Sequence, residues 1–385
     1  MEIAPWVFGF LVLLGHTQVV IFAHNRFYGL PLGHKTIDLI QFGHFLWLMV
    51  GPLVIWFLWS GNIPTTQTVD PEWLRSLLWG LAIVGLVCPP MDLLKRALRR
   101  RMSYVSFRAP ISSVHSEHPG ELAGSGIWAR IALLPGNRSL RPVLDRTEVQ
   151  LAGLPPVLDG LTILHLSDLH VGKTPNALFF ERVAQELANL EPDLICLTGD
   201  LVEKGGPSHA DIFGGFLKKL RFREAGLAIL GNHDFWHPTE PTLKVLSELG
   251  YTHLGNQRQT IRVRGREVVI WGLEYPWNPE LPTGWNDKLG DWTLCLSHTP
   301  DHFPFFSRLG SGLMLAGHVH GGQIRFPIIG PVIMPSVHGR TFDQGWFRRK
   351  NAYLHVSQGL GAGHPIRFGC YPGASLITLR CENGR

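Results

Sequence analysis

The chain has 385 residues, which is longer than one average domain, so two or more folded units are expected. Hydrophobic residues make up 45% of the chain and charged residues only 17%, and the apolar excess lies in the first ninety residues. The net charge of +5 is uneven, because residues 95–146 carry +7 whereas residues 147–385 are neutral overall. The charge distribution therefore excludes a broadly basic working domain, and we expect no nucleic-acid partner.

Three segments of residues 1–94 are apolar enough and long enough to cross a membrane as helices. We predict these spans at residues 3–22, 39–59 and 73–90. A cleaved signal peptide is the alternative for the first span, but that span lacks a preceding basic stretch and a small-residue cleavage site. Residues 1–94 are therefore predicted to form a membrane domain.

The placement of Lys and Arg predicts how this membrane domain is oriented. Arg26 and Lys35 lie in the first predicted loop, and the second loop (Ser60–Glu72) has neither residue type. A basic run (Lys95–Arg101) follows the third span, and positively charged loops stay in the cytoplasm. Three crossings from an outside N-terminus therefore satisfy every loop and predict a multi-pass inner-membrane protein whose remaining chain is cytoplasmic. If the third segment lies in the membrane interface instead, the remaining chain faces outward.

Beyond the membrane domain, residues 95–146 contain Gly and Pro and lack clear periodicity, so we predict a basic linker there with some strand content. In residues 147–385, short apolar runs alternate with helical patterns and then give way to strand-rich sequence. This order predicts an α/β fold in which helices cover two packed sheets, a four-layer αββα sandwich. The predicted strands are Leu161–Leu166, Leu194–Thr198, Leu227–Leu230, Ile261–Val263, Val268–Gly272, Thr293–Leu296, Leu313–Ala316, Tyr353–Val356 and Leu376–Leu379. Helices are predicted from Thr174, as N-cap, to about Leu190, near Ile212–Leu220, and from Thr239 to Gly250.

Polar clusters directly follow five of these predicted strands. Because ligands at the carboxyl ends of adjacent strands converge on one crevice, we expect these side chains to meet. Two Asp, four His and one Asn without Cys suit Mn, Fe, Zn or Co, and seven ligands are too many for one site that also binds water. Two metals are therefore predicted, with Asp200 as the bridging carboxylate. The predicted ligands are Asp168, His170, Asp200, Asn232, His298, His318 and His320.

Each of these residues alone is more often an ordinary loop or core residue, and only the repetition at five strand ends argues for a site. Three glycines strengthen the pattern, because Gly199, Gly231 and Gly317 each precede a predicted ligand. A glycine there lets the backbone turn tightly or approach a metal closely.

The five clusters, in this order and over about residues 160–325, resemble the signature of calcineurin-like metallophosphoesterases. Further motifs are similar to a bacterial membrane-tethered branch, which includes enzymes that cleave the pyrophosphate of UDP-2,3-diacylglucosamine in lipid A synthesis. Val319 replaces the usual Thr between two ligands, and no ligand position is missing. The motifs of the narrower resemblance are Ser167–His170, Gly317–Gln323, Arg325–Pro327, Gly359–Gly363 and Ile366-Arg367.

The resemblance implies two divalent metal ions, with manganese favoured, and it assigns their ligands. The first metal would be bound by Asp168, His170, Asp200 and His320, and the second by Asp200, Asn232, His298 and His318. Such metals would neutralise a substrate phosphate and activate a water molecule for attack on phosphorus. The implied activity is hydrolysis of a phosphoric ester or anhydride.

Other residues near these motifs have weaker assignments. His233 could protonate the leaving oxygen while Asp234 orients its ring, the alternative being a structural hydrogen-bonded pair. Arg325 and Arg367 could contact a second phosphate, and a plain surface turn is an equal alternative. Ile324–Met334 could engage a lipid tail, although a packed hairpin is the favoured interpretation.

Three functions remain open from the sequence. The leading hypothesis is a membrane-anchored, two-metal phosphohydrolase that cleaves a phosphoester or pyrophosphate bond of a lipid-linked substrate such as UDP-2,3-diacylglucosamine. The first alternative is a broad phosphodiesterase or phosphatase that acts on soluble phosphorylated substrates. The second is a non-enzymatic metal-binding scaffold, which the complete ligand set disfavours.

Overall fold

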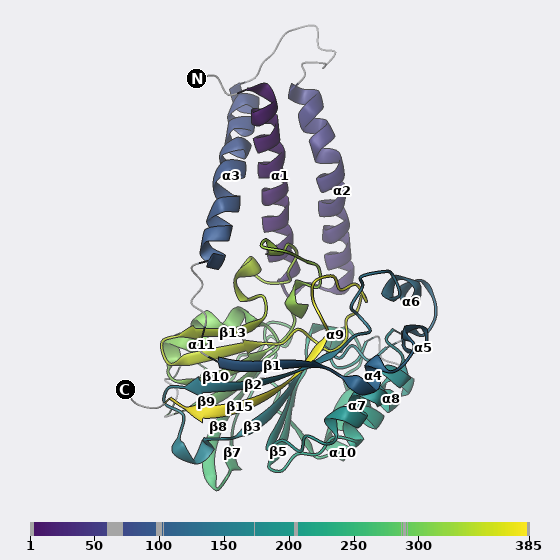
Figure 1. Cartoon of the computed structure of the whole chain (residues 1–385). Coiled ribbons are helices and arrows are strands. Elements are labelled where there is room, and N and C mark those ends of the chain that lie inside the picture. Colours follow the sequence, from purple (N-terminus) through teal and green to yellow (C-terminus); the bar gives the residue numbers. More distant parts are fainter. Residues whose placement is uncertain are drawn as a thin grey trace. The chain divides into compact units, whose positions relative to one another are not determined.

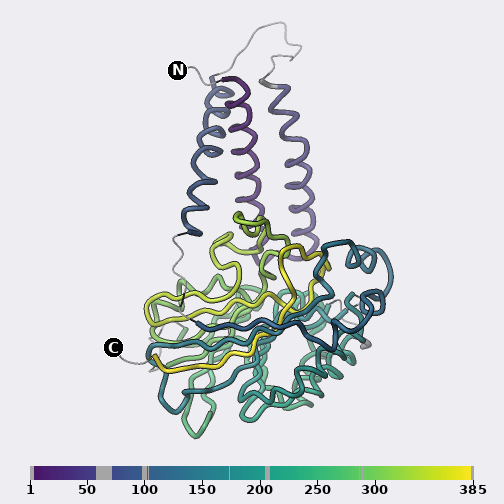
Figure 2. The backbone as a smooth tube through the Cα atoms, viewed as in Figure 1, coloured from purple at the N-terminus to yellow at the C-terminus, as the bar shows by residue number. Residues whose placement is uncertain are grey.

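The computed structural model describes residues 4–59, 72–97, 102, 104–172, 174–203, 207–285, 287, 290 and 292–382. The chain divides into two compact units, Met1–Arg100 and Arg101–Arg385, which are drawn as a cartoon in Figure 1 and as a backbone tube in Figure 2. All of the predicted second loop except Glu72 (residues 60–71) lies outside the described residues, as do the arginines at 99–101.

The first unit contains three long helices, α1 (Pro5–Tyr28), α2 (His34–Trp59) and α3 (Glu72–Ala97). All three are long and apolar enough to cross a membrane, so the three predicted apolar helices are confirmed. The first and third helices end six or seven residues later than predicted, and the second begins five residues earlier. That these helices cross a membrane remains a prediction. Gly15 and Gly85 allow α1 and α3 to approach closely, because a Cβ atom on either glycine would collide with a carbonyl oxygen of the other helix.

The second unit is built on two large sheets. The first sheet has the strand order β1 (Tyr104–Pro110), β2 (Val143–Leu151), β15 (Gly373–Cys381), β3 (Thr162–Leu166), β4 (Leu194–Thr198), β5 (Ala225–Ile229) and β6 (Tyr251–His253). The second has the order β13 (Gly345–Arg349), β14 (Ala352–Val356), β10 (Gly312–Ala316), β9 (Thr293–Ser297), β8 (Arg266–Leu273) and β7 (Arg258–Val263). The predicted strands are confirmed, with their ends shifted by at most three residues.

Three buried clusters define the layers of this unit. The outer face of the first sheet packs against the helices α7 (Ala177–Leu187), α8 (Pro207–Lys218) and α10 (Glu240–Glu248). Its inner face packs against the second sheet, with Leu227 and Leu294 in the same cluster. The far face of the second sheet is covered by α11 (Phe303–Leu309) and neighbouring loops. These layers confirm the predicted four-layer αββα sandwich.

Part of the predicted linker is folded into the second unit. Strand β1 pairs antiparallel with β2 along its whole length, and three short helices lie between them: α4 (Ser112–His115), α5 (Pro119–Ala123) and α6 (Ile127–Ala132). Ile111 and Leu122 are fully buried in the same cluster as α7. The predicted strand content of this segment is confirmed, but its position and the helices were not predicted, because β1 is an exposed edge strand and the helices are too short to show a period.

The start of α7 also differs from the prediction. The N-cap is Asn176, whose side chain accepts a hydrogen bond from the backbone of Phe179 at 3.3 Å. The predicted cap, Thr174, is therefore wrong, because an amide oxygen two residues later already satisfies a free N–H group of the first turn.

Candidate metal centre

The candidate ligands lie where the two sheets present the carboxyl ends of their parallel strands. In the first sheet β3, β4 and β5 run parallel, and in the second β8, β9 and β10 run parallel. Strands β4 and β5 contact β9 across the sandwich. Residues that follow β3, β4, β5, β9 and β10 therefore reach one crevice from both sheets, as the sequence predicted.

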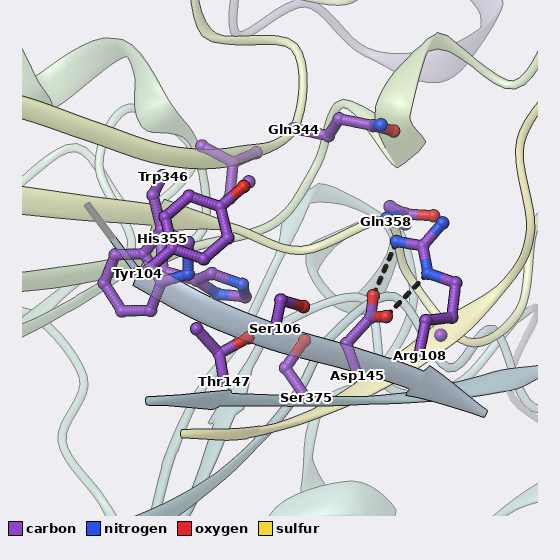
Figure 3. A pocket seen from close by; sticks show the side chains of 13 residues that line it. Tyr104, Ser106, Arg108, Asp145, Thr147, Gln344, Trp346, His355, Gln358 and Ser375 are labelled. Carbon is purple, nitrogen blue, oxygen red and sulfur yellow. Dashed lines mark hydrogen bonds and ion pairs between the residues drawn. The ribbon is translucent and has the colours of Figure 1, made fainter. Parts of the chain in front are cut away.

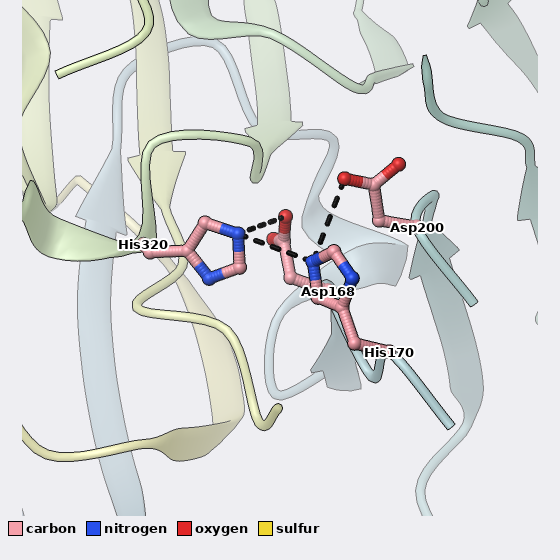
Figure 4. A group of neighbouring side chains, drawn as sticks. All are labelled: Asp168, His170, Asp200 and His320. Carbon is pink, nitrogen blue, oxygen red and sulfur yellow. Dashed lines mark hydrogen bonds and ion pairs between the residues drawn. The ribbon is translucent and has the colours of Figure 1, made fainter. Parts of the chain in front are cut away.

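The first group of ligand atoms is formed by two carboxylates and two imidazoles, shown in Figure 4. His320 Nε2 lies 3.2 Å from His170 Nε2 and 3.4 Å from Asp168 Oδ1. His170 Nε2 lies 3.6 Å from Asp200 Oδ2. All four side chains come from loops that directly follow strands, and three of the four residues are buried.

The second group shares Asp200 with the first and adds His298 and His318. His298 Nε2 lies 3.3 Å from Asp200 Oδ2 and 3.1 Å from Asn232 Oδ1. His318 Nε2 is buried and has no hydrogen-bond partner in the part of the chain that the structure describes. An unpaired polar atom this deeply buried is rare and points to a missing ligand.

The donor atoms fit two cations. Ligands bound at about 2.1 Å in tetrahedral or octahedral geometry lie roughly 3.0–3.4 Å apart, close to the separations observed here. The imidazoles are also prepared for coordination, because His170 Nδ1 donates to Glu203 Oε2 at 2.8 Å and His298 Nδ1 donates to the Thr198 carbonyl at 2.7 Å. These bonds hold the Nδ1 protons and orient each Nε2 toward the crevice, where a bound metal would take the place of any Nε2 proton.

Backbone conformation at the site is unusual. Five of the seven candidate ligands are non-glycine residues with φ between 45° and 69°, and left-handed backbone costs about 1–3 kcal/mol at each. The five are Asp168, His170, Asp200, His318 and His320. Two of the glycines before the ligands are needed for lack of space. A Cβ on Gly231 would collide with the Asp200 carboxylate, and a Cβ on Gly317 would collide with the Asp168 carboxylate. Strain concentrated in this way is typical of a functional site.

The charges of the site are strongly coupled. Burial alone raises the pKa of Asp200, but the neighbouring His298 and His233 hold it well below its usual value, so this carboxylate stays ionised. Burial lowers the pKa of His298, but the charge of Asp200 and a hydrogen bond to it raise that pKa to about 9. For His318, burial and His298 lower the pKa well below its usual value.

Glu203 is a functional candidate that the sequence analysis missed. Its carboxylate accepts a hydrogen bond from His170 Nδ1 and another from His233 Nδ1, the latter at 3.0 Å to Oε2. The predicted partner of His233, Asp234, instead accepts bonds from the backbone of Leu201, Val202 and Gly231. The prediction that Asp234 orients His233 is therefore wrong, and Glu203 does so. The only sequence signal was an acid three residues after Asp200.

The two arginines predicted to bind substrate have structural contacts. Arg367 is 1% exposed and donates to the carbonyls of Gly359 and Gly361, so it cannot reach a substrate without breaking these bonds. Arg325 donates to the Gly321 carbonyl and forms an ion pair with Asp343 at 3.0 Å. These guanidinium groups therefore hold the loops around His320, and contact of either arginine with a substrate remains a prediction.

Comparison with known proteins agrees with this geometry. The model of the family described as calcineurin-like phosphoesterase matches residues 161–322, which include all seven candidate ligands. Over 229 residues the chain is 30% identical to the uncharacterized metallophosphoesterase YkoQ of Bacillus subtilis, covering 56% of this chain and 83% of that protein. The chain belongs to the calcineurin-like phosphoesterase family.

Two further relatives have names that describe an activity. This calcineurin-like phosphoesterase is 28% identical over 221 residues to phosphodiesterase YaeI of Escherichia coli, covering 56% of this chain and 81% of that protein. It is 23% identical over 287 residues to UDP-2,3-diacylglucosamine pyrophosphatase LpxG of Chlamydia muridarum, covering 58% and 84% respectively. The family and these relatives identify the second unit as a phosphoester hydrolase, and we call it the catalytic unit.

Proposed function

We propose that the chain is a membrane-anchored hydrolase that uses two divalent cations to cleave a phosphoester or pyrophosphate bond of a lipid-linked substrate. The observation that carries this proposal is the carboxylate of Asp200, which belongs to both ligand groups. Two cations bridged there would offset the phosphate charge and activate water for attack on phosphorus. Manganese is our first choice among Mn, Fe, Zn and Co, because oxygen donors from Asp168, Asp200 and Asn232 suit it.

His233 is the proposed proton donor to the leaving oxygen. Its side chain is 18% exposed, so it can approach a substrate, whereas His298 is fully buried. With Nδ1 held by Glu203, Nε2 is available for a proton transfer. The backbone N–H of His233 donates to Asp200 Oδ1 at 2.8 Å, which ties the position of the ring to the bridging carboxylate.

An exposed apolar hairpin beside the centre supports a lipid-linked substrate. Strands β11 (Arg325–Phe326) and β12 (Gly330–Pro331) pair antiparallel, and Ile328 at the tip is 85% exposed. Phe326 and Ile329 are each about half exposed, so the hairpin does not bury its apolar side chains as the favoured interpretation of the sequence predicted. The hairpin begins five residues after His320. The acyl chain of a substrate could therefore contact the hairpin while the phosphate of the same substrate lies at the metal centre.

The membrane attachment and orientation belong to the same proposal. Three helices of membrane-spanning length in the same chain support an anchor, and the basic residues at 95–101 support a cytoplasmic catalytic unit. The relative named UDP-2,3-diacylglucosamine pyrophosphatase supports a diacylated sugar pyrophosphate as substrate. A broader activity on soluble diesters is the second candidate, because another relative is named as a phosphodiesterase.

The test compares a membrane-embedded and a soluble substrate on the full chain in lipid nanodiscs. Bound metal is measured first, and turnover is then followed with a diacylated sugar pyrophosphate and with a soluble nitrophenyl diester. We expect about two metal ions per chain and faster turnover of the lipid substrate. Absence of bound metal with undiminished turnover would refute the two-metal proposal, whereas faster turnover of the soluble diester would favour the second candidate.

A matched pair of variants tests the role of the hairpin. Ile328→Ser should lower the ratio of lipid to diester turnover by about tenfold, because transfer of an exposed isoleucine into lipid contributes about 1.5–3 kcal/mol. Val157→Ser is the control, since Val157 is an exposed apolar residue of the turn before β3, at the opposite end of that strand from Asp168. An equal ratio in all three proteins would remove the hairpin from the proposal.

A further inference from the structure

A second polar cavity lies in the catalytic unit at the edge of the sandwich. It has a volume of about 130 Å³ and opens between β1, β2 and β15 of one sheet and β13 and β14 of the other (Figure 3). Tyr104 and Trp346 supply aromatic surface, and Ser106, Thr147 and Ser375 supply hydroxyl groups. None of the lining residues is a candidate metal ligand, so this cavity is separate from the metal centre.

Along the strands that line the cavity, the side chains that face the second sheet change from apolar to polar. Val149 and Ile377 on the inner face of the first sheet lie in the apolar cluster between the sheets. Two residues before each of them on the same face stand Thr147 and Ser375, which line the cavity. A sandwich normally fills this face with apolar side chains, so the sequence departs from that pattern only at the end where the cavity lies.

Several polar groups of the lining have no partner within the protein. Thr147, Ser375 and Trp346 are each at least nine-tenths buried. Among the described residues, no hydrogen bond engages the two hydroxyl groups. The indole Nε1 of Trp346 is also unpaired, but it is fully buried and does not reach the open space of the cavity. Buried polar atoms are nearly always hydrogen-bonded, so groups that face a cavity without a partner point to an occupant that supplies one.

The lining carries no unbalanced charge. Arg108 is bound by Asp145 through two hydrogen bonds of 2.6 and 2.7 Å. Burial lowers the pKa of His355 to about 3, so this imidazole is neutral at physiological pH. A phosphate or a carboxylate would therefore meet no free cation here, and a neutral occupant fits best.

We propose that this cavity binds a neutral polyhydroxyl compound, a small polyol or a single sugar ring. Its hydroxyl groups would bond with Thr147 and Ser375, and its C–H face would lie against the rings of Tyr104 and Trp346, whose centroids are 6.4 Å apart. The cavity would also hold about four water molecules, at roughly 30 Å³ each. Water alone gives no reason for two aromatic rings in the lining, which a compound with an apolar face does.

A hydrogen-bond chain connects this cavity to the metal centre. His355 Nδ1 lies 2.9 Å from His165 Nδ1, and His165 Nε2 lies 2.9 Å from the Thr198 hydroxyl. The carbonyl of Thr198 accepts from His298, a candidate ligand of the second metal. An occupant that contacts His355 is therefore three hydrogen bonds from the metal centre.

The test measures binding of glycerol and of simple monosaccharides to the full chain by saturation-transfer NMR, in a zwitterionic detergent that contains no sugar. We expect saturable binding that weakens at least about fivefold in Thr147→Val, which removes one hydroxyl partner at nearly constant volume. Ser106→Phe should abolish binding, because it fills the cavity from an exposed edge strand. Thr260→Val, an exposed threonine on β7, is the control and should bind as the parent chain does.

Folding of each variant is checked by its thermal unfolding midpoint, and a variant that does not fold is replaced by the other. Absence of saturable binding for every compound would overturn the proposal and leave an ordered-water cavity. Binding that is the same in Ser106→Phe as in the parent chain would overturn it as well, because the compounds would then bind elsewhere.

Discussion

The catalytic unit contains two polar regions, the candidate metal centre and the cavity between the sheets, and their backbone conformations differ. At the metal centre, five of seven candidate ligands have left-handed backbone, and their donor atoms converge on Asp200. In the cavity between the sheets, none of the non-glycine lining residues has a positive φ, and most of the polar side chains extend from regular strands. The metal centre therefore depends on a backbone held in place by many contacts, whereas the cavity requires only a change of side chain on an existing sheet.

This difference predicts unequal sensitivity to mutation. Each ligand at the metal centre is supported by further bonds, such as those that Glu203 accepts from His170 and His233. Removing one group there leaves a charged neighbour without its partner in a buried site, which strongly lowers the stability of the folded chain. Removing one hydroxyl in the cavity leaves only a neutral group unpaired, so its effects should be smaller.

The largest effect is expected for Asp200→Ala. Loss of the carboxylate shared by both ligand groups should abolish binding of at least one metal and lower turnover by about a thousandfold or more. Metal content by mass spectrometry and turnover of the nitrophenyl diester are the measurements. Asp211→Ala, an exposed acid on α8, is the control. Retention of both metals and of activity would contradict the bridging role.

His233→Ala should keep both metals and lower turnover by roughly 10²–10⁴-fold, as expected for loss of a general acid. The loss should be small for a nitrophenyl leaving group, which needs no proton, and large for an alkyl leaving group. His237→Ala, which changes a histidine two residues after the end of α9 (Asn232–Phe235), provides the comparison. An equal loss with both leaving groups would argue that the ring positions the substrate and donates no proton.

Glu203→Gln should weaken metal affinity or activity by about 10–100-fold, because it removes the negative acceptor that orients His170 and His233. Asp234→Asn should act differently, since Asp234 accepts backbone bonds from three residues and its loss should lower the unfolding midpoint. Metal titration and thermal unfolding of both variants separate the two roles. If the two variants lost metal affinity alike, the distinction between orienting and structural carboxylates would fail.

The seven candidate ligands were predictable from the sequence because each follows an apolar run that becomes a buried strand. Parallel strands bring their carboxyl ends together. The position of His298 and Asp168 after predicted strands was therefore enough to predict that they lie in one crevice. Asp234 was misassigned because it is adjacent to His233 only in the chain. Both residues lie on α9 (Asn232–Phe235), where successive side chains point about 100° apart.

The sequence could not predict how deeply an individual side chain is buried, or which strand lies at the edge of a sheet. Arg367 resembles a surface arginine in the sequence, yet it is fully buried among backbone carbonyls. Strand β1 has no buried face that would produce alternation, so its residues were assigned to a linker whose strand content could not be placed. The cavity was invisible for the same reason, because Ser106, Thr147 and Ser375 belong to three strands that only the sheet order brings together.

The smallest effect concerns acid stability at the cavity. The pKa of His355 is lowered by burial to about 3 in the folded chain, whereas an unfolded histidine titrates near 6.5. Below pH 6.5 the unfolded chain therefore binds a proton that folded His355 does not, and the free energy of unfolding falls as the pH falls toward 3. One such group contributes at most about 1.4 kcal/mol per pH unit.

His355→Asn should reduce the slope of the unfolding free energy against pH by the amount that corresponds to about one bound proton. Thermal unfolding of the parent chain and the variant is followed from pH 7 to pH 4 with a chelator present, so that release of metal does not contribute. At pH 7 the variant should be slightly less stable, because it disrupts the bond to His165. Identical pH dependence in the two proteins would mean that His355 titrates in the folded chain as it does in the unfolded chain. Folded His355 would then be charged at acidic pH, and the cavity would accept an anion there more readily than a neutral polyol.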